Sequence, residues 1–511
     1  MHSLFARYSY KLVSNLFTFI LGSITTVVIP KSLGPSDYGN LTFLTTFFTT
    51  FISTIDFGSS TWFYTKLSQH PNRRTLPKYY SIIVLTIFIV TFAFIACVFL
   101  LNKDNSLWPG QQRKYILIAA TYASFAWCLN IFDKMSDAFG LTVYSERFKI
   151  LQKILGAIAI LTLFYLSKIT IASIFAYQCS LAMVGSLLMY SVIKSKKKQL
   201  FYCKEGLHFK NHSKDMYTYI GPLIFCTLIG FVGSYFDRWI LQLLGGGNEQ
   251  GFFSVAFSII SLCSFFTSSM TPLLIREYSI SAAENDYHKI STLFRSKVPL
   301  LYTVAAYFSC FLFCHADNVV KIVGGEKYLN AIPALMILSF YPNWQVYGQL
   351  SGSLFLATGN TRLYRNLSVF FTLFGIPLTY LLIAPTNKYG LNAGAIGLAV
   401  KTILINFLSV NVQLYFNAKM LKLSFSRYFF HQIYIIAILV AIAFLSKKLI
   451  MLIPFDNFDN YILEFISSGV VYTCFIFVLI ELASKFYWVR ENMQEVVQLK
   501  NLIDIFRKKL F

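Results

Sequence analysis

The sequence predicts an all-α polytopic membrane protein. Of its 511 residues, 56% are hydrophobic and only 13% are charged, whereas a soluble domain has about 25% charged residues. The hydrophobic residues form long blocks, for example 12–29 and 79–101. A helix needs roughly 20 mostly apolar residues to cross the hydrocarbon core, whereas the strands of a membrane barrel alternate over about 10 residues. The blocks do not alternate, so they predict transmembrane helices.

We predict fourteen such helices, each built from one apolar block bounded by polar or turn residues. They occupy residues 9–30, 39–65, 79–101, 115–138, 150–166, 169–193, 217–244, 251–275, 298–314, 331–357, 367–384, 392–416, 428–446 and 461–483. The division that follows is an N-terminal lobe of six helices (1–195), a basic cytoplasmic linker (196–216), a second lobe of six (217–420), two further helices (421–484) and a basic cytoplasmic tail (485–511).

The basic residues indicate the orientation of the chain in the membrane. The formal net charge is +22, but the 44 Lys and Arg residues form short clusters between apolar blocks rather than one patch. No nucleic-acid partner is therefore predicted. Most of these residues fall in alternate loops, on the side that also holds both termini. Because cytoplasmic loops are enriched in Lys and Arg, we expect both termini to be cytoplasmic.

Two segments of the chain resemble each other. LGPSDYG (33–39) precedes one long span, and LGGGNEQG (244–251) precedes another. Leu, Gly and turn residues of this kind are also ordinary signals for the end of a helix. Each of the two segments leads into a span of similar length, however, which favours a repeat. Six helices per lobe give both lobes the same orientation, which predicts a pseudo-two-fold axis along the membrane normal.

These segments also resemble a known family. LGPSDYG, the YFDRWIL run (235–241), GFFSVAF (251–257), PLLIREY (272–278) and TGNT (358–361) are similar to Wzx-type polysaccharide repeat-unit flippases, within the multidrug/oligosaccharidyl-lipid/polysaccharide (MOP) exporter superfamily. The resemblance extends over nearly the whole chain. It implies two six-helix lobes around a central cavity, and alternating access.

The resemblance implies a function and its partners. The expected substrate is an undecaprenyl-diphosphate-linked oligosaccharide, the repeat unit of O-antigen, capsule or a related glycan. The expected location is the bacterial inner (cytoplasmic) membrane, where membrane lipids surround the chain and a polymerase and chain-length proteins are partners. The alternatives are a small-molecule or drug antiporter of the same superfamily, and a membrane-embedded glycan polymerase or ligase. The predicted external loops are too short for the catalytic loop of such an enzyme.

Five basic residues are candidates for binding the substrate diphosphate. Arg suits a diphosphate through bidentate hydrogen bonds and Lys suits it as a point charge. Arg7, Lys11 and Arg276 would attract it near the cytoplasmic face, and Arg238 and Lys401 would guide it deeper. The competing interpretation is that Arg238 pairs with a nearby carboxylate and that the residues at the helix ends merely extend towards water.

Two acidic residues inside predicted spans, Asp56 and Asp237, are candidates for binding a coupling ion, H⁺ or Na⁺. The alternative for Asp56 is an ion pair with a cation from another span, since ionisable residues within membranes commonly pair. No ATP-binding loop, hydrolase motif or zinc motif is found, so no catalytic residue and no cofactor are predicted. Cys310, Cys314 and His315 lack the spacing of a haem attachment site, and no metal is predicted.

Overall fold

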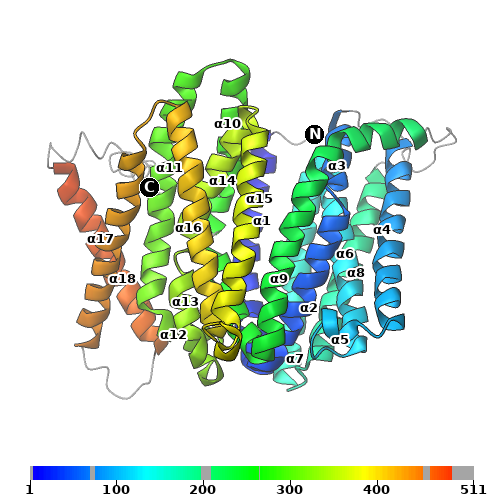
Figure 1. Cartoon of the computed structure of the whole chain (residues 1–511), viewed down its shortest axis with the longest axis horizontal. Helices are drawn as coiled ribbons and strands as arrows, with labels where there is room; N and C mark the ends of the chain where they lie inside the picture. Colours follow the sequence, from blue (N-terminus) through cyan, green and yellow to red (C-terminus); the bar gives the residue numbers. More distant parts are fainter. Residues whose placement is uncertain (1–3, 70–74, 197–208, 264, 453–460, 486–511) are drawn as a thin grey trace. The chain divides into compact units, whose positions relative to one another are not determined.

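The computed structural model describes residues 4–69, 75–196, 209–263, 265–452 and 461–485. Every regular element in these ranges is a helix (Figure 1). The greater part of the predicted linker, 197–208, and the tail from residue 486 lie outside the described residues. The predicted fold class is confirmed: the chain is an all-α, multi-pass membrane protein.

The chain divides into two compact units, Met1–Ser254 with Thr379–Gly394, and Val255–Leu378 with Ala395–Phe511. The helices of the first unit are α1 (Leu4–Leu33), α2 (Pro35–Ile55), α3 (Ser59–Gln69), α4 (Thr75–Leu100), α5 (Asp104–Leu107), α6 (Arg113–Ala138), α7 (Thr142–Tyr165), α8 (Ile171–Lys196) and most of α9 (Phe209–Cys263). A short 3₁₀ helix, Thr386–Lys388, also belongs to this unit.

The second unit contains the remaining helices, and α15 and α16 each contribute one end to the first unit. They are α10 (Phe265–Ala283), α11 (Tyr287–Cys314), α12 (Ala316–Val323), a 3₁₀ helix (Glu326–Ala331), α13 (Ile332–Leu338), α14 (Tyr341–Ala357), α15 (Thr361–Ile383), α16 (Gly394–Met420), α17 (Phe425–Met451) and α18 (Tyr461–Lys485). The predicted lobe boundary at 195–217 stays a prediction.

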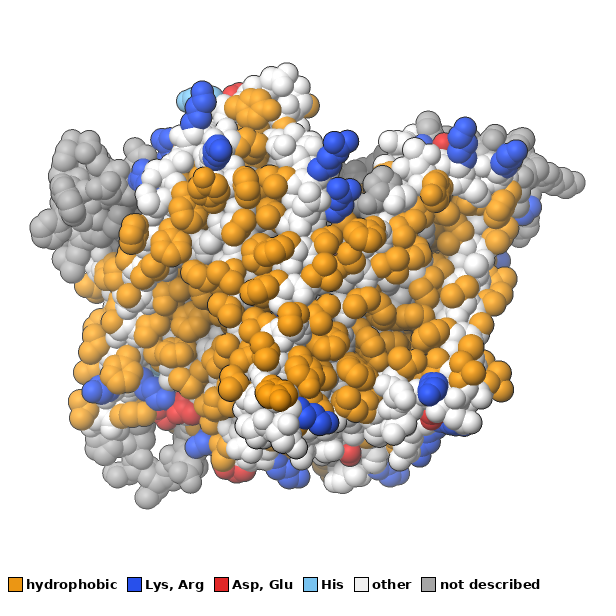
Figure 2. Space-filling view, viewed as in Figure 1, with side chains coloured by type: hydrophobic (Ala, Val, Ile, Leu, Met, Phe, Trp, Pro, Cys, Tyr) orange, Lys and Arg blue, Asp and Glu red, His pale blue; other side chains and the backbone are white. Residues whose placement is uncertain are grey.

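All fourteen predicted spans overlap helical residues. Within the described ranges, ten helices are long and apolar enough to cross a bilayer, and α2 with α3, bent by 55°, makes an eleventh. In Figure 2 the hydrophobic side chains gather along the middle of the helices, while Lys and Arg lie towards the helix ends. This distribution is the one that a hydrocarbon layer selects, because charged groups are costly inside it.

The boundary predicted between the seventh and eighth spans, residues 245–250, contains a kink in α9. Helical residues continue on both sides of Gly246, which alone leaves the helical conformation (φ 69°, ψ −170°), and α9 runs on to Cys263. Gly34 has the matching conformation (φ 78°, ψ 171°) directly before α2. A positive φ favours glycine. The repeat is therefore present in the backbone, and it aligns Gly34 with Gly246.

The two copies of the repeat pack against each other through their backbones. A Cβ atom at Gly39 would overlap the Gly247 carbonyl, and one at Gly251 would overlap the Pro35 carbonyl. Thr42 Oγ1 donates to Ser254 Oγ at 2.8 Å, and these residues are 212 positions apart, as Gly39 and Gly251 are. The contacts are reciprocal, so a local two-fold axis relates the two segments. Glycine is required because helices approach this closely only without side chains.

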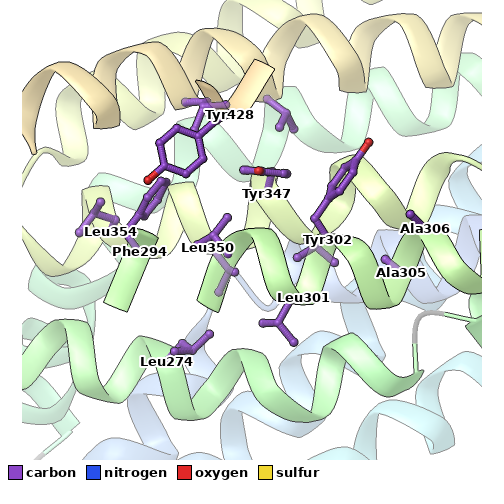
Figure 3. Close-up of a cluster of buried hydrophobic side chains, with 14 of the residues drawn as sticks. Leu274, Phe294, Leu301, Tyr302, Ala305, Ala306, Tyr347, Leu350, Leu354 and Tyr428 are labelled. Carbon is purple, nitrogen blue, oxygen red and sulfur yellow. The ribbon is translucent and has the colours of Figure 1, made fainter. Parts of the chain in front are cut away.

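The core of the second unit combines apolar packing with one polar network. Tyr302 and Tyr347 pack edge to face, with ring centroids 5.2 Å apart, among buried Leu, Val and Phe side chains (Figure 3). The Gln432 side chain exchanges hydrogen bonds with Asn411 and accepts one from Trp344 Nε1 at 3.1 Å. Bonds of this kind hold helices together where hydrophobicity alone does not. Together these contacts join α11, α14, α16 and α17.

We predict that Gly39→Val lowers the yield and melting temperature of the detergent-solubilised protein. The new side chain must displace backbone atoms, and overpacking typically costs about 1–3 kcal/mol. The matched control is Gly230→Val, because a Cβ at Gly230 meets no atom within 4 Å. Equal melting temperatures for the two variants would contradict the close helix contact.

Candidate functional site

Arg238 is a part-buried cation within α9. Its Nη1 donates to Ser254 Oγ at 3.1 Å, and its guanidinium carbon lies 4.4 Å from the centre of the Phe253 ring. Ser254 is also the acceptor for Thr42. A cation over an aromatic ring gains about 2 kcal/mol when desolvated. The glycine contact between α2 and α9 therefore positions the partners of Arg238.

Asp237 precedes Arg238 in α9, and its carboxylate interacts electrostatically with the guanidinium. Its Oδ1 accepts a hydrogen bond of 2.6 Å from Thr379 Oγ1, on the part of α15 that belongs to the first unit. The structure therefore brings the Asp237 carboxylate and the Thr379 hydroxyl together. Carboxylate and hydroxyl oxygens are donors that hard cations accept. Sequence reasoning missed Thr379, since its distance from Asp237 along the chain is 142 residues.

Asp56 lies at the bend between α2 and α3, and it is 7% exposed. Its carboxylate accepts hydrogen bonds from the hydroxyls of Ser59 and Ser60, at 2.5 and 2.6 Å, and from the Ser60 backbone N–H at 3.0 Å. This arrangement caps the first turn of α3. Lys134 Nζ, from α6, donates to Ser60 Oγ at 2.9 Å. The cation and the carboxylate are thus linked through the Ser60 hydroxyl.

The other predicted cations have different surroundings. Arg276 has a side chain that is 73% exposed and lies 4.0 Å from the Glu277 carboxylate. The Lys401 side chain packs against Gly375 of α15. A Cβ atom added at Gly375 would lie 2.9 Å from Lys401 Cε and 3.2 Å from Lys401 Nζ. Arg276 and Lys401 belong to the second unit, and Arg238 to the first. Arg7 and Lys11 lie on α1, and their side chains are outside the described residues.

A cluster of charged side chains lies in the first unit, on a helix that begins earlier than we predicted. We expected the fifth span to begin at residue 150, whereas α7 begins at Thr142 and contains Lys149 and Lys153. Lys149 Nζ lies 2.8 Å from Asp133 Oδ2 of α6 and 3.0 Å from Glu146 Oε1. Polar residues at 149, 152 and 153 share one helical face. That spacing was the available signal, and it was obscured by beginning the span after Lys149.

No group of three or more His, Cys, Asp or Glu side chains suited to a metal is found among the described residues. The side chains of Cys310, Cys314 and His315 each contact a different backbone carbonyl. Cys310 Sγ contacts the Ile436 carbonyl, Cys314 Sγ contacts the Val440 carbonyl, and His315 Nδ1 lies 3.1 Å from the Phe311 carbonyl. These contacts give the three side chains structural roles.

Comparison with known proteins finds a matching family and a relative. The family model for polysaccharide biosynthesis proteins matches residues 5–274. An uncharacterized membrane protein of Methanocaldococcus jannaschii is 25% identical over 364 residues, covering 70% of this chain and 68% of that protein.

Solved transporter structures have the same fold. The inward closed conformation of the lipid II flippase MurJ matches with a TM-score of 0.66 and 15% identity, covering 92% of this chain and 98% of that chain. An inward-facing multidrug resistance MATE family transporter of the MOP superfamily matches with a TM-score of 0.57 and 16% identity, covering 81% and 99%. At these identities the similarity establishes the fold.

We predict that Asp56→Ala lowers the stability of the protein by about 1–3 kcal/mol, because it removes a cap and leaves buried Ser hydroxyls without an acceptor. Thermal unfolding of the solubilised protein measures the loss. Asp215→Ala is the control, since Asp215 is exposed and only 3.5 Å from Lys66 in a surface pair, which contributes little. If both variants unfold at the same temperature, Asp56 has no capping role.

Proposed function

The chain belongs to the polysaccharide biosynthesis protein family, and on this premise we propose that it is a lipid-linked oligosaccharide flippase. Its substrate would be an undecaprenyl-diphosphate-linked repeat unit of O-antigen, capsule or a related glycan. The protein would move it from the inner to the outer leaflet of the bacterial cytoplasmic membrane by alternating access. The proposal describes transport, with no covalent step for the protein to catalyse.

The observation that best supports the proposal is the environment of Arg238. A charged side chain within a span is costly and usually faces a bundle interior or a water-filled cavity. Arg238 contacts the Ser254 hydroxyl and the Phe253 ring, and it interacts electrostatically with the Asp237 carboxylate. Arg suits a phosphate because its guanidinium presents N–H donors in a rigid fork. A diphosphate requires such contacts because it loses hydration within the membrane.

The remaining cations extend this proposal along the substrate path. Arg276 is exposed on α10, as an initial attractor for a diphosphate would be. Arg7 and Lys11 would serve the same role from α1, and Lys401 would act deeper, within α16. A positively lined path favours an anionic substrate over the cationic compounds of a drug antiporter. We assign both termini to the cytoplasmic side, following the distribution of basic residues.

The energy source in this proposal is an ion gradient, of H⁺ or Na⁺. Asp237 is the stronger of the two candidate ligands, because its carboxylate is paired with the hydroxyl of Thr379 and lies beside Arg238 in sequence. The oxygens of Asp56 already accept from Ser59 and Ser60. An ion at Asp237 would alter the charge next to Arg238, which links ion binding to substrate binding.

We predict that deletion of the gene removes surface glycan and causes lipid-linked repeat units to accumulate on the inner leaflet. Wild-type protein restores export. Arg238→Gln at equal protein level lowers export at least about tenfold, because charge-assisted hydrogen bonds contribute about 1.5–3 kcal/mol. Glycan staining and extraction of lipid-linked sugars measure the two quantities.

Lys388→Gln is the control for this experiment. Lys388 lies in the Thr386–Lys388 turn, outside the spans, and its loss should leave export unchanged. Normal surface glycan in the deletion strain, with no second exporter present, would reject the flippase proposal. Full export by Arg238→Gln would remove Arg238 from the substrate path.

A further inference from the structure

The first unit contains a cavity of about 480 Å³ between four helices, α1, α6, α7 and α8. Pockets for small organic ligands typically measure about 300–1,000 Å³. The volume therefore suits an organic molecule rather than a bare ion. The polar side chains of its lining are those of Thr18, Thr25, Tyr122, Asn130, Asp133, Lys149, Gln152, Lys153, Tyr177 and Gln178.

The two lysines of the cavity differ in their electrostatic environment. Lys149 is neutralised by Asp133 and Glu146, at 2.8 and 3.0 Å. Lys153 lies one turn further along α7, lines the same cavity and is exposed to it. In the described part of the chain it has no ion-pair or hydrogen-bond partner. A lone ammonium near the middle of a membrane helix is costly, so its presence marks a functional site.

The cavity also offers hydrogen-bond acceptors. Asp133 Oδ1 and Gln178 Oε1 are buried, and neither has a hydrogen-bond partner among the described residues. A buried acceptor without a donor costs about 1–3 kcal/mol. The lining thus presents one positive charge together with acceptors that suit hydroxyl groups. A ligand with one negative group and several hydroxyls matches both.

Small residues fix the shape of this lining. Gly156 makes room for the Tyr177 hydroxyl, which would lie 2.9 Å from a Cβ atom there. Gly185 accommodates the Gln152 carboxamide, and Gln152 Nε2 donates to the Leu181 carbonyl at 2.8 Å. At Gly22, by contrast, a Cβ atom would meet nothing within 4 Å. The walls are therefore packed, and the open space adjoins α1.

We propose that this cavity binds an acidic sugar, a hexuronic acid, with its carboxylate on Lys153 and its hydroxyls on Gln178 and Asp133. The identity of the ligand rests on the proposed function, since a sugar of the exported glycan would be its source. A metal cation is the poorer occupant, because the lining contains two ammonium groups, Lys149 and Lys153, against the single carboxylate of Asp133. An anionic lipid headgroup shares the negative charge and is the competing source.

The test measures binding with the full-length protein in phosphatidylcholine nanodiscs. Thermal unfolding is followed during titration with sodium galacturonate, and with galactose plus sodium chloride at the same ionic strength. Galacturonate should raise the unfolding temperature in a saturable way, because a ligand that binds only the folded state stabilises it. Galactose should bind at least about tenfold more weakly, since it lacks the charge-assisted contact. Equal effects of the two sugars, or none, would overturn the proposal.

Four variants assign the binding to the cavity. Lys153→Met should weaken galacturonate binding at least about tenfold, and Lys153→Arg should retain it, because the charge is kept. Gly22→Phe should abolish binding by filling the open space beside α1. Lys168→Met is the control, since it removes a lysine that is exposed beyond the end of the same helix. Undiminished binding by both Lys153→Met and Gly22→Phe would place the sugar elsewhere.

A parallel set of nanodiscs contains phosphatidylglycerol. A stabilisation that depends on Lys153 and on this lipid, with no response to galacturonate, would assign the cavity to a lipid headgroup and overturn the sugar proposal. Binding is measured without translocation. Its failure therefore leaves the flippase proposal standing, and the export experiment with Arg238→Gln decides that proposal separately.

Discussion

The backbone contact between α2 and the second half of α9 is the constraint on which the candidate site depends. Gly39 and Gly251 allow the two helices to approach until each meets a carbonyl of the other segment. Three residues further along each helix, Thr42 and Ser254 are joined by a hydrogen bond. Ser254 in turn accepts from Arg238. The glycine contact therefore determines where a buried guanidinium lies, although no glycine touches it.

The low dielectric of the membrane explains how the other buried charges are arranged. A polar group inside hydrocarbon must find its partners within the protein. Asp56 is surrounded by Ser59 and Ser60, Asp237 is bonded to Thr379, and Lys149 has two carboxylates. Each of these arrangements would persist without a ligand. Lys153 differs, because it lines a cavity and forms no ion pair with the described residues.

Much of the fold could be predicted because hydrophobic length is a local property of the sequence. The apolar blocks predicted where helices occur, and the residues around Gly39 and Gly251 indicated a repeat. The kink at Gly246 falls between the predicted seventh and eighth spans, but Gly245, Gly246 and Gly247 are indistinguishable by type. Only the backbone conformation identifies the residue with positive φ.

The candidate site was harder to predict, because its contacts join distant parts of the chain. Asp56 could be singled out as a buried acid, but its capping role required the bend at the start of α3. Nothing in the sequence joins Asp237 to Thr379, or Lys149 to Asp133. Lys149 was left outside the fifth span, predicted to begin at residue 150, because charge near an apolar block resembles a helix end. The helical spacing of Lys149, Gln152 and Lys153 was the stronger signal.

The most direct test of the central claim is translocation by the purified protein in sealed vesicles. The vesicles contain an undecaprenyl-diphosphate oligosaccharide in both leaflets, an ion gradient across the membrane and an added glycosidase that cannot enter. Without protein, the inner-leaflet share of the sugar stays protected. With the wild-type chain the account predicts that this protected share becomes cleavable while the vesicles remain sealed. A protected share that persists unchanged, with correctly folded protein and either H⁺ or Na⁺ as the gradient, would contradict the account.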